Sequence, residues 1–457
     1  MSARMARIPS TSPQEIPLSQ TPRQILDQEP MGRFQIIAVT ICICLYAIDG
    51  FDVLSISFAA PGIAEEWGIN RAVLGIVLSM ELIGMALGSI VIGPIADRWG
   101  RRPTILLCLV IVSIGMAAAS TASSVPVLAA YRLGTGLGIG GMLAATSAMT
   151  AEYASARFRQ LSVILMAGGY PVGVVIGGSI ASQLLVSYDW RAVFLFGAAA
   201  SALFIPIVWL ALPESIDHLS QKRPENALTR INAILKRMGH QQVSELPNIE
   251  QPTASLTRLL APNLRKTTLL LILAYFVHIM TFYFILKWIP KVVADMGFHP
   301  SEAGGVLVWA NVGGVLGSVL IGLLTQRFKL WSLLLGALAG SAVCVILFGQ
   351  GQADLVRLSI VAAAAGFFTN AAIVAMYATF ADVFPTELRA GGTGLVIGFG
   401  RGGAVLGPIV TGFLFQAEFG LSTVAALMSL GSLIAACAIF LLRSEITRAT
   451  ERHHESL

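Results

Sequence analysis

Two aspartates stand three residues apart inside the first long apolar stretch of the chain. Asp49 and Asp52, in the segment Ile48-Asp49-Gly50-Phe51-Asp52, lie within a run that extends from about residue 34 to residue 60. Residues three apart share one face of a helix. A charge at a bilayer centre costs about 2.5–3.5 kcal/mol on insertion scales and persists where it faces a cavity or a partner. The pair is therefore predicted to be a titratable site that binds protons.

Further ionisable residues lie inside later apolar runs: Glu81, Arg132, His278, Lys287 and Arg401. At a rise of about 1.5 Å per residue, Asp49 and Arg132 both fall in the outer half of a core about 30 Å thick. They are predicted to pair or to exchange partners, because protonation of Asp49 would remove the charge that restrains Arg132. A static pair that fixes two helices is the alternative. Glu81 is expected to relay a proton or to neutralise Arg401.

These residues need membrane-spanning helices to position them, and the composition supports such helices. The 457 residues are 55% hydrophobic and 12% charged, about half the charged fraction of an ordinary soluble domain. Apolar runs long enough to cross a bilayer recur twelve times, near residues 34–60, 72–96, 103–123, 125–150, 161–186, 191–212, 267–289, 302–325, 330–349, 356–380, 390–415 and 421–442. The predicted fold is an all-α membrane protein with twelve transmembrane helices.

The runs divide into two sets of six. The predicted parts are an N-terminal tail (1–33), a first six-helix bundle (34–212), a linker (213–266), a second six-helix bundle (267–442) and a C-terminal tail (443–457). Most Lys and Arg residues lie in the tails, the linker and alternate loops, which places both termini in the cytoplasm by the positive-inside rule. Repeated six-helix halves are typical of transporters that bind substrate between the halves.

Charged residues at the predicted cytoplasmic helix ends could act as gates. The loop after the second run reads Gly93-Pro94-Ile95-Ala96-Asp97-Arg98-Trp99-Gly100-Arg101-Arg102. Glu152 and Arg159 recur 230 residues later as Asp382 and Arg389. We interpret Asp97, Arg98, Arg101, Arg102, Glu152, Arg159, Asp382 and Arg389 as gating residues. Solvated helix ends are the alternative, since exposed ion pairs contribute about 0–1 kcal/mol.

The loop resembles the Gly-x-x-x-Asp-Arg-x-Gly-Arg-Arg motif of the major facilitator superfamily. Asp49-Gly50-Phe51-Asp52, together with Ala381-Asp382-Val383-Phe384-Pro385-Thr386 and Gly398-Phe399-Gly400-Arg401, is similar to the aromatic acid:proton symporter family. The likeness covers nearly the full chain. The second copy of the loop departs from the family pattern, with Gln326 where Asp is usual. The resemblance implies a major facilitator fold and transport of aromatic acids.

A substrate carboxylate would be bound best by Arg401, about eleven residues into its run, because a guanidinium presents a fork to two oxygens. Packing against backbone carbonyls is the alternative role for this residue. Other predicted substrate-binding residues are Arg132, Tyr170, His278, Phe282, Tyr283, Trp309, Asn311 and Tyr377.

The sequence predicts a proton-coupled secondary transporter that imports a small aromatic carboxylate, of benzoate or hydroxybenzoate type, by alternating access. A carrier of another organic anion, an exporter and a membrane sensor remain alternatives. We expect no enzymatic activity, no metal and no cofactor, with protons as the coupling ion. The expected partners are the substrate and the lipid bilayer, without nucleic acid. A monomer in a bacterial inner membrane is predicted.

Overall fold

The computed structural model describes residues 21–246, 256–351, 354–385 and 388–455. Throughout these residues the regular structure is helical. The first part contains α1 (Pro22–Gln28), α2 (Arg33–Trp67), α3 (Arg71–Val91), α4 (Gly93–Trp99), α5 (Arg101–Ser120), α6 (Val125–Tyr153), α7 (Arg159–Ser187) and α8 (Arg191–Ala211). The linker contributes α9 (Ile216–Lys222), α10 (Ala227–Met238) and the short 3-10 helix η1 (Leu256–Leu260). The second part contains α11 (Pro262–Asp295), α12 (Pro300–Leu324), α13 (Leu330–Gly349), α14 (Leu355–Val383), α15 (Arg389–Gln416) and α16 (Leu421–Glu455).

The prediction of twelve spans is confirmed, since twelve helices in the described residues are long and apolar enough to cross a membrane. Several helices are longer than their apolar runs. Helix α2 continues past residue 60 through Pro61 and ends where Gly68 adopts a left-handed conformation, φ 58°. That conformation is accessible to glycine at no steric cost and stops a helix. The apolar pattern therefore located the membrane core of α2 rather than its ends.

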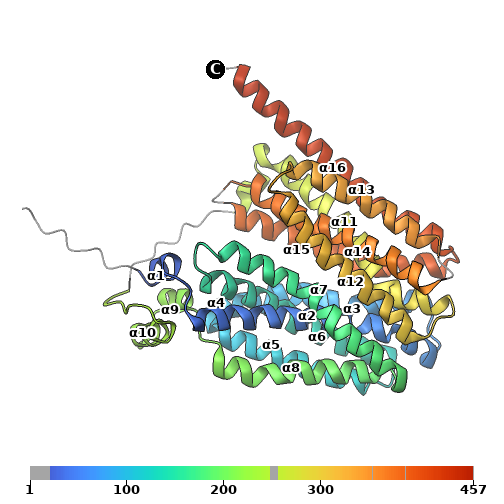
Figure 1. The fold of residues 1–457 in the computed structure, drawn as a ribbon, viewed down its shortest axis with the longest axis horizontal. Coiled ribbons are helices and arrows are strands. Elements are labelled where there is room, and N and C mark those ends of the chain that lie inside the picture. The colour runs from blue at the N-terminus through green and yellow to red at the C-terminus, as the bar shows by residue number, and fades with distance from the viewer. Residues whose placement is uncertain (1–20, 247–255, 352–353, 386–387, 456–457) are drawn as a thin grey trace, which may run out of the picture.

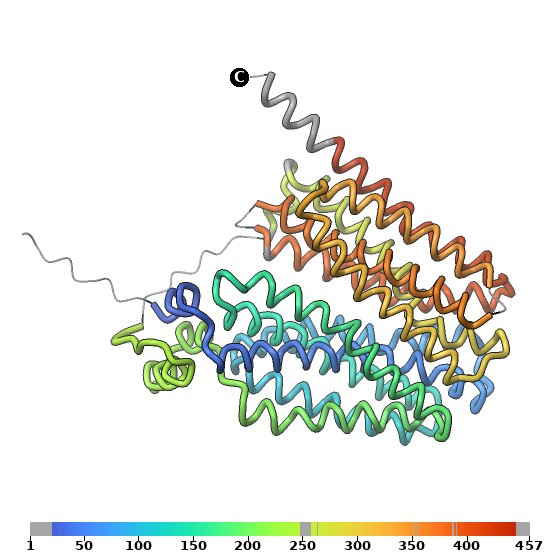
Figure 2. Tube along the Cα trace, in the orientation of Figure 1, coloured from blue at the N-terminus to red at the C-terminus, as the bar shows by residue number. Residues whose placement is uncertain are grey.

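The spanning helices form two groups of six, α2–α8 with α4 as a short extension of α3, and α11–α16 (Figures 1 and 2). Within the groups equivalent pairs pack together: α2 on α7 and α11 on α15, α3 on α6 and α12 on α14. Helices α6 and α14 each have 29 residues and begin 230 residues apart. The repeat seen in the sequence is therefore a repeat of helix bounds as well.

The two groups meet through reciprocal helix pairs, α3 with α15 and α7 with α12, and through α2 with α11. We call the end of the molecule that carries α1 the α1 end, and the opposite end the far end. Close backbone packing joins the groups near the far end: a Cβ added to Gly75 would lie 2.5 Å from the carbonyl oxygen of Pro408. Arg71 and Asp295 form an ion pair of 3.0 Å there. These contacts hold the far end closed in this conformation.

Helices α1, α9 and α10 lie together beyond one end of the first group (Figure 1). Helix α10 is amphipathic and buries Ile231 and Leu235 in one apolar cluster with Leu26 of α1 and Ile216 of α9. The linker and the residues before α2 therefore form a small packed layer on the first group.

Candidate functional site

A buried ion pair lies at the centre of the first group. Glu81 of α3 and Arg132 of α6 are both fully buried, and an Nη of Arg132 contacts Oε2 of Glu81. The guanidinium also donates a hydrogen bond of 2.8 Å to the carbonyl oxygen of Asp52 and lies 5.3 Å from the ring centroid of Phe194. Another Nη of Arg132 contacts the sulfur of Met116 at 2.8 Å, so a carboxylate, a main-chain oxygen, a sulfur and an aromatic face together fix the orientation of Arg132.

The two aspartates of α2 are buried beside this ion pair but have different surroundings. Neither carboxylate oxygen of Asp49 has a hydrogen-bond partner within the described residues. Asp52 accepts a hydrogen bond of 3.0 Å from Ser201 of α8 through Oδ2. An ionised carboxylate that is buried without a partner is costly. Asp49 is therefore the group best placed to take up a proton, and Asp52 lies inside the first group rather than at the outer surface.

Gly50 and Phe51, between the aspartates, pack α2 against neighbouring helices. A Cβ on Gly50 would lie 2.2 Å from the carbonyl oxygen of Tyr170 on α7, so only glycine fits this crossing. The ring of Phe51 meets that of Phe196 at a centroid distance of 5.1 Å. The Asp-Gly-Phe-Asp segment therefore combines two buried carboxylates with the residues that set how closely α2 approaches α7 and α8.

Lys287 brings a charge from the second group to the same place. It is fully buried on α11, its Nζ donates a hydrogen bond to the carbonyl oxygen of Val53, and it lies 3.7 Å from Oε2 of Glu81. Glu81 thus faces Arg132 and Lys287 in this structure, rather than Arg401. Sequence reasoning did not include Lys287 in the site, because its position near the end of an apolar run suggested a side chain that reaches out to water.

Tyrosines from both groups gather around Arg401 of α15. The hydroxyls of Tyr275 and Tyr377 are 2.9 Å apart, and Gly400, adjacent to Arg401, packs so closely on Tyr275 that a Cβ would lie 2.0 Å from its ring. The charge of Arg401 lies within electrostatic range of Tyr46, Tyr275, Tyr283 and Tyr377. Its guanidinium donates a hydrogen bond of 3.2 Å to the carbonyl oxygen of Met85.

The first group adds a pair of rings to this arrangement, Tyr46 of α2 and Tyr170 of α7, at a centroid distance of 5.9 Å. The hydroxyl of Tyr170 is buried and faces that of Tyr283. We call Tyr46, Tyr170, Tyr275, Tyr283, Tyr377 and Arg401 the tyrosine ring. The ring offers a guanidinium for a carboxylate, aromatic faces, and hydroxyls that can donate or accept hydrogen bonds.

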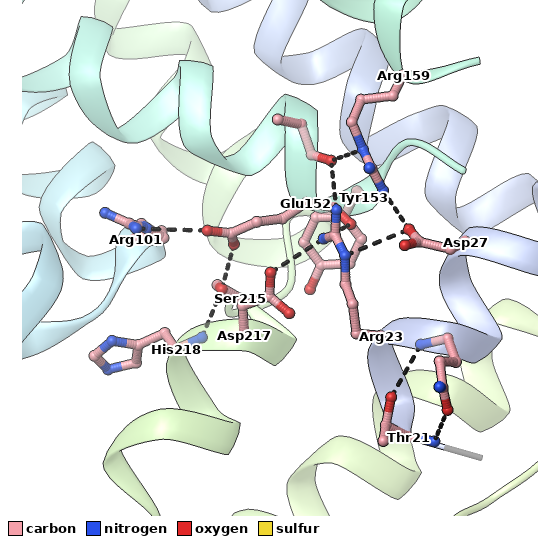
Figure 3. A network of polar contacts seen from close by, with 12 residues as sticks. Thr21, Arg23, Asp27, Arg101, Glu152, Tyr153, Arg159, Ser215, Asp217 and His218 are labelled. Atoms are coloured by element: carbon pink, nitrogen blue, oxygen red, sulfur yellow. Dashed lines mark hydrogen bonds and ion pairs between the residues drawn. The ribbon is translucent and has the colours of Figure 1, made fainter. Parts of the chain in front are cut away.

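At the α1 end, a polar network joins α5, α6 and α9 (Figure 3). Arg101 lies 2.7 Å from Asp97 and 3.5 Å from Glu152, and Glu152 accepts a hydrogen bond from the hydroxyl of Ser215. Glu214 accepts from the main-chain NH groups of Arg101, at 2.8 Å, Arg102, at 3.3 Å, and Ser215, at 2.8 Å. Glu214 therefore caps the start of α5, where NH groups lack helical partners.

The same network continues into α1. Asp27 binds Arg159 and lies 3.3 Å from Arg23, and Arg23 also forms an ion pair of 3.0 Å with Asp217, as Figure 3 shows. Burial raises the pKa of the Asp217 carboxyl, against the effect of Arg23. Helix α1 is thus tied both to the start of α7 and to the linker.

The family model for the Major Facilitator Superfamily matches residues 42–350 and 271–456 of the chain. The chain belongs to this superfamily. Two crystal structures confirm the fold: a D-xylose-proton symporter, with a TM-score of 0.68, 16% identity and coverage of 90% of this chain and 97% of that one, and an inward-facing bacterial homologue of the human lysosomal transporter Spinster, with a TM-score of 0.68, 19% identity and the same coverage.

Curated relatives of this superfamily member are named as transporters of aromatic acids. The 4-hydroxybenzoate transporter PcaK of Pseudomonas putida is 31% identical, over 84% of this chain and 87% of its own length. The gallate transporter of Pseudomonas putida is 29% identical, over 91% and 93%, and the benzoate transport protein of Acinetobacter baylyi is 28% identical, over 86% of each. The predicted membership of the superfamily's aromatic acid transporters is confirmed.

Three residues predicted to bind substrate have contacts with residues outside the tyrosine ring or are exposed. His278 is buried inside the second group, with Nδ1 2.9 Å from the Ser432 hydroxyl and Nε2 3.0 Å from the Thr369 carbonyl. Asn311 is buried and donates to the carbonyl of Leu307 in its own helix. Trp309 is 54% exposed, on the face of α12 that also exposes Leu316 and Leu323. The substrate-binding roles of His278, Asn311 and Trp309 stay predictions.

Phe282 is buried next to Tyr283, with ring centroids 5.3 Å apart, so it can support the ring. Tyr46 and Tyr275 were missed by sequence reasoning. Tyr46 lies three residues before Asp49, and Tyr275 lies seven before Phe282, so helical spacing could have found both.

In the first group, residues of the superfamily's loop motif form the polar network described above. No equivalent network is present in the described residues of the second group. Arg102 stacks over Trp209, with Cζ 5.5 Å from the ring centroid, whereas Arg98 is exposed. Asp382 and Arg389, which repeat Glu152 and Arg159, are exposed. Gln326 replaces the acidic residue and is exposed too. The gating roles assigned to these residues stay predictions.

Proposed function

We propose that this superfamily member is a proton-coupled secondary transporter that imports a small aromatic carboxylate, of benzoate or hydroxybenzoate type, by alternating access. It would act as a monomer in a bacterial inner membrane, with the α1 end and both termini in the cytoplasm. The observation that carries the proposal is the placement of the buried carboxylates of Asp49 and Asp52 beside the ion pair of Glu81 and Arg132, on the helix α2 that also contributes Tyr46 to the tyrosine ring.

The tyrosine ring supports an aromatic acid as the substrate. Arg401 binds the carboxylate, because its planar fork matches two oxygens and its charge does not depend on pH. The faces of Tyr46 and Tyr170 pack on the ring of the substrate, since aromatic pairs favour offset or tilted contact at centroid distances of about 4.5–7 Å. The hydroxyls of Tyr275 and Tyr377 hydrogen-bond ring substituents. The gallate and 4-hydroxybenzoate named for the relatives carry such hydroxyls.

Proton coupling is supported by Asp49, because a buried carboxylate without a partner favours its neutral form. A proton on Asp49 leaves Arg132 and Arg401 with less negative charge around them, which favours the arrival of a substrate anion. In alternating access the two groups rock against each other, so the far end and the α1 end open in turn. The charged residues of the loop motif act as the gate at the α1 end.

The proposal is tested with purified protein in liposomes and labelled 4-hydroxybenzoate. We expect accumulation that is faster when the outside is acidic and that a protonophore abolishes. Benzoate should compete, whereas cyclohexanecarboxylate, which has the same carboxylate on a saturated ring, should compete weakly. Liposomes without protein are the control. Uptake that a protonophore leaves unchanged would contradict proton coupling, and equal competition by the two acids would contradict an aromatic site.

A further inference from the structure

Lys287 is a buried cation whose partners belong to the other half of the protein. Its side chain is fully buried. Its ammonium binds the carbonyl oxygen of Val53 on α2 and lies 3.7 Å from Oε2 of Glu81 on α3. Helix α11, which carries Lys287, belongs to the second group, whereas α2 and α3 belong to the first. The function proposed above gives this residue no role, although it joins the two moving parts at the carboxylates.

The charges around Glu81 come from both groups. Arg132 on α6 and Lys287 on α11 face Glu81 with cations, and Asp49 and Asp52 on α2 face it with carboxylates. One turn further along α3, the guanidinium of Arg401 on α15 binds the carbonyl oxygen of Met85. Arg132 stays near Glu81 in any rocking motion, because α3 and α6 pack within the first group. Lys287 moves with the second group. The number of cations at the carboxylates therefore depends on whether the far end is closed.

We propose that Lys287 is a positioning residue for proton coupling: its ammonium approaches the carboxylate of Glu81, beside Asp49 and Asp52, while the far end is closed and leaves it when that end opens. The inference rests on the proposed function, which places the far end outside. Lys287 thereby makes the tendency of the carboxylates to bind protons differ between the two conformations.

The physical reason is the effect of an opposite charge on a carboxylate. A cation within about 4–6 Å favours the ionised form, and the effect is larger in a buried site than in water. With the far end open, only Arg132 would face the carboxylates, so protons from the outer water bind to carboxylate oxygens. With the far end closed, the ammonium of Lys287 returns and favours proton release to the cytoplasmic water. Protons are thus taken up on one side and released on the other.

Burial distinguishes the Lys287 contact from the exposed ion pair near the far end. Arg71 and Asp295 also join the groups, at 3.0 Å, but their side chains are 43% and 30% exposed, so water replaces the pair when it separates. Lys287 is fully buried, and a buried ammonium without its partner is costly. Its separation from Glu81 therefore depends on water that enters as the far end opens.

The test is Lys287→Gln in liposomes, with two measurements on one preparation. Exchange of labelled for unlabelled 4-hydroxybenzoate at equal pH reports binding and rocking, and uptake driven by a pH gradient reports coupling. We expect exchange within about twofold of wild type and a loss of about tenfold or more in gradient-driven accumulation, with a flattened pH profile. Lys287→Arg should restore accumulation and its pH profile. Arg357→Gln, which removes a 77% exposed cation on α14, is the matched control and should behave like wild type.

Two results would overturn the inference. One is wild-type accumulation and an unchanged pH profile in Lys287→Gln. The other is the loss of exchange together with accumulation in a Lys287→Gln protein that elutes as a single species, which would make Lys287 a requirement of movement or folding. If Lys287→Gln does not elute as a single species, Lys287→Arg is the deciding variant. A Lys287→Arg protein that exchanges substrate normally but does not accumulate it would overturn the role of the cation. Failure of the proposed function is distinct, because wild type itself would then not transport aromatic acids.

Discussion

Arg132 forms its buried ion pair with Glu81, and not with Asp49, although Asp49 and Arg132 lie at compatible depths. The rise per residue places side chains along the helix axis, whereas the rotation of each helix decides which of them meet. Arg132 therefore has a permanent carboxylate partner, and Asp49 is left as a buried acid without a hydrogen bond in the described residues. Glu81 thus has cationic partners in this structure, whereas Asp49 has none within hydrogen-bond distance in the described residues.

Asp49→Asn is expected to abolish accumulation of 4-hydroxybenzoate driven by a pH gradient while substrate exchange at equal pH continues. The amide keeps the size of the side chain but cannot exchange a proton in this range. Accumulation ratios in liposomes measure the effect, and Asp354→Asn, at the exposed N-cap of α14, is the control. Full accumulation in Asp49→Asn would exclude this residue from coupling.

Arg401→Lys is expected to weaken the apparent affinity for 4-hydroxybenzoate by about tenfold, because an ammonium cannot bind both carboxylate oxygens in the planar geometry of a guanidinium. The measurement is the inhibition of labelled uptake by unlabelled substrate, with Arg357→Lys as the matched control. An unchanged apparent affinity would assign Arg401 to packing against the Met85 carbonyl instead.

Gly50→Ala is expected to destabilise the protein, since its Cβ would lie 2.2 Å from the carbonyl oxygen of Tyr170 and force α2 away from α7. Overpacking of this kind costs about 1–3 kcal/mol. The matched control is Gly168→Ala on α7, where no atom lies within 4 Å of the added Cβ. Thermal unfolding in detergent should show a lower midpoint for Gly50→Ala alone; equal midpoints would contradict the close crossing.

Glu214→Ala is expected to loosen the start of α5, because the carboxylate accepts hydrogen bonds from the main-chain NH groups of Arg101, Arg102 and Ser215. The loss of a helix cap costs about 0.5–2 kcal/mol. Limited proteolysis should cut faster between α4 and α5 in this variant. Glu225→Ala, at an exposed position of the linker, provides the comparison, and an equal rate of cutting in both variants would argue against the cap.

The sequence alone determined the twelve helices, their division by a linker and the 230-residue repeat, because these depend on local apolar length and on spacing along the chain. It also identified Asp49, Asp52, Glu81, Arg132 and Arg401 as charged residues that the membrane tolerates only with partners or a cavity. The loop motif from Gly93 to Arg102 indicated the superfamily that the comparisons confirm.

Only the tertiary structure decided which of these residues meet. Contacts between helices far apart in the sequence brought Lys287 to Glu81 and Arg23 to Asp217. They also gave His278 its partners on α14 and α16, and brought the hydroxyl of Tyr275 to that of Tyr377. Spacing along a helix fixes which residues share a face, but the direction of that face depends on packing against all neighbouring helices. That packing is a property of the assembled bundle and is not encoded in any single segment.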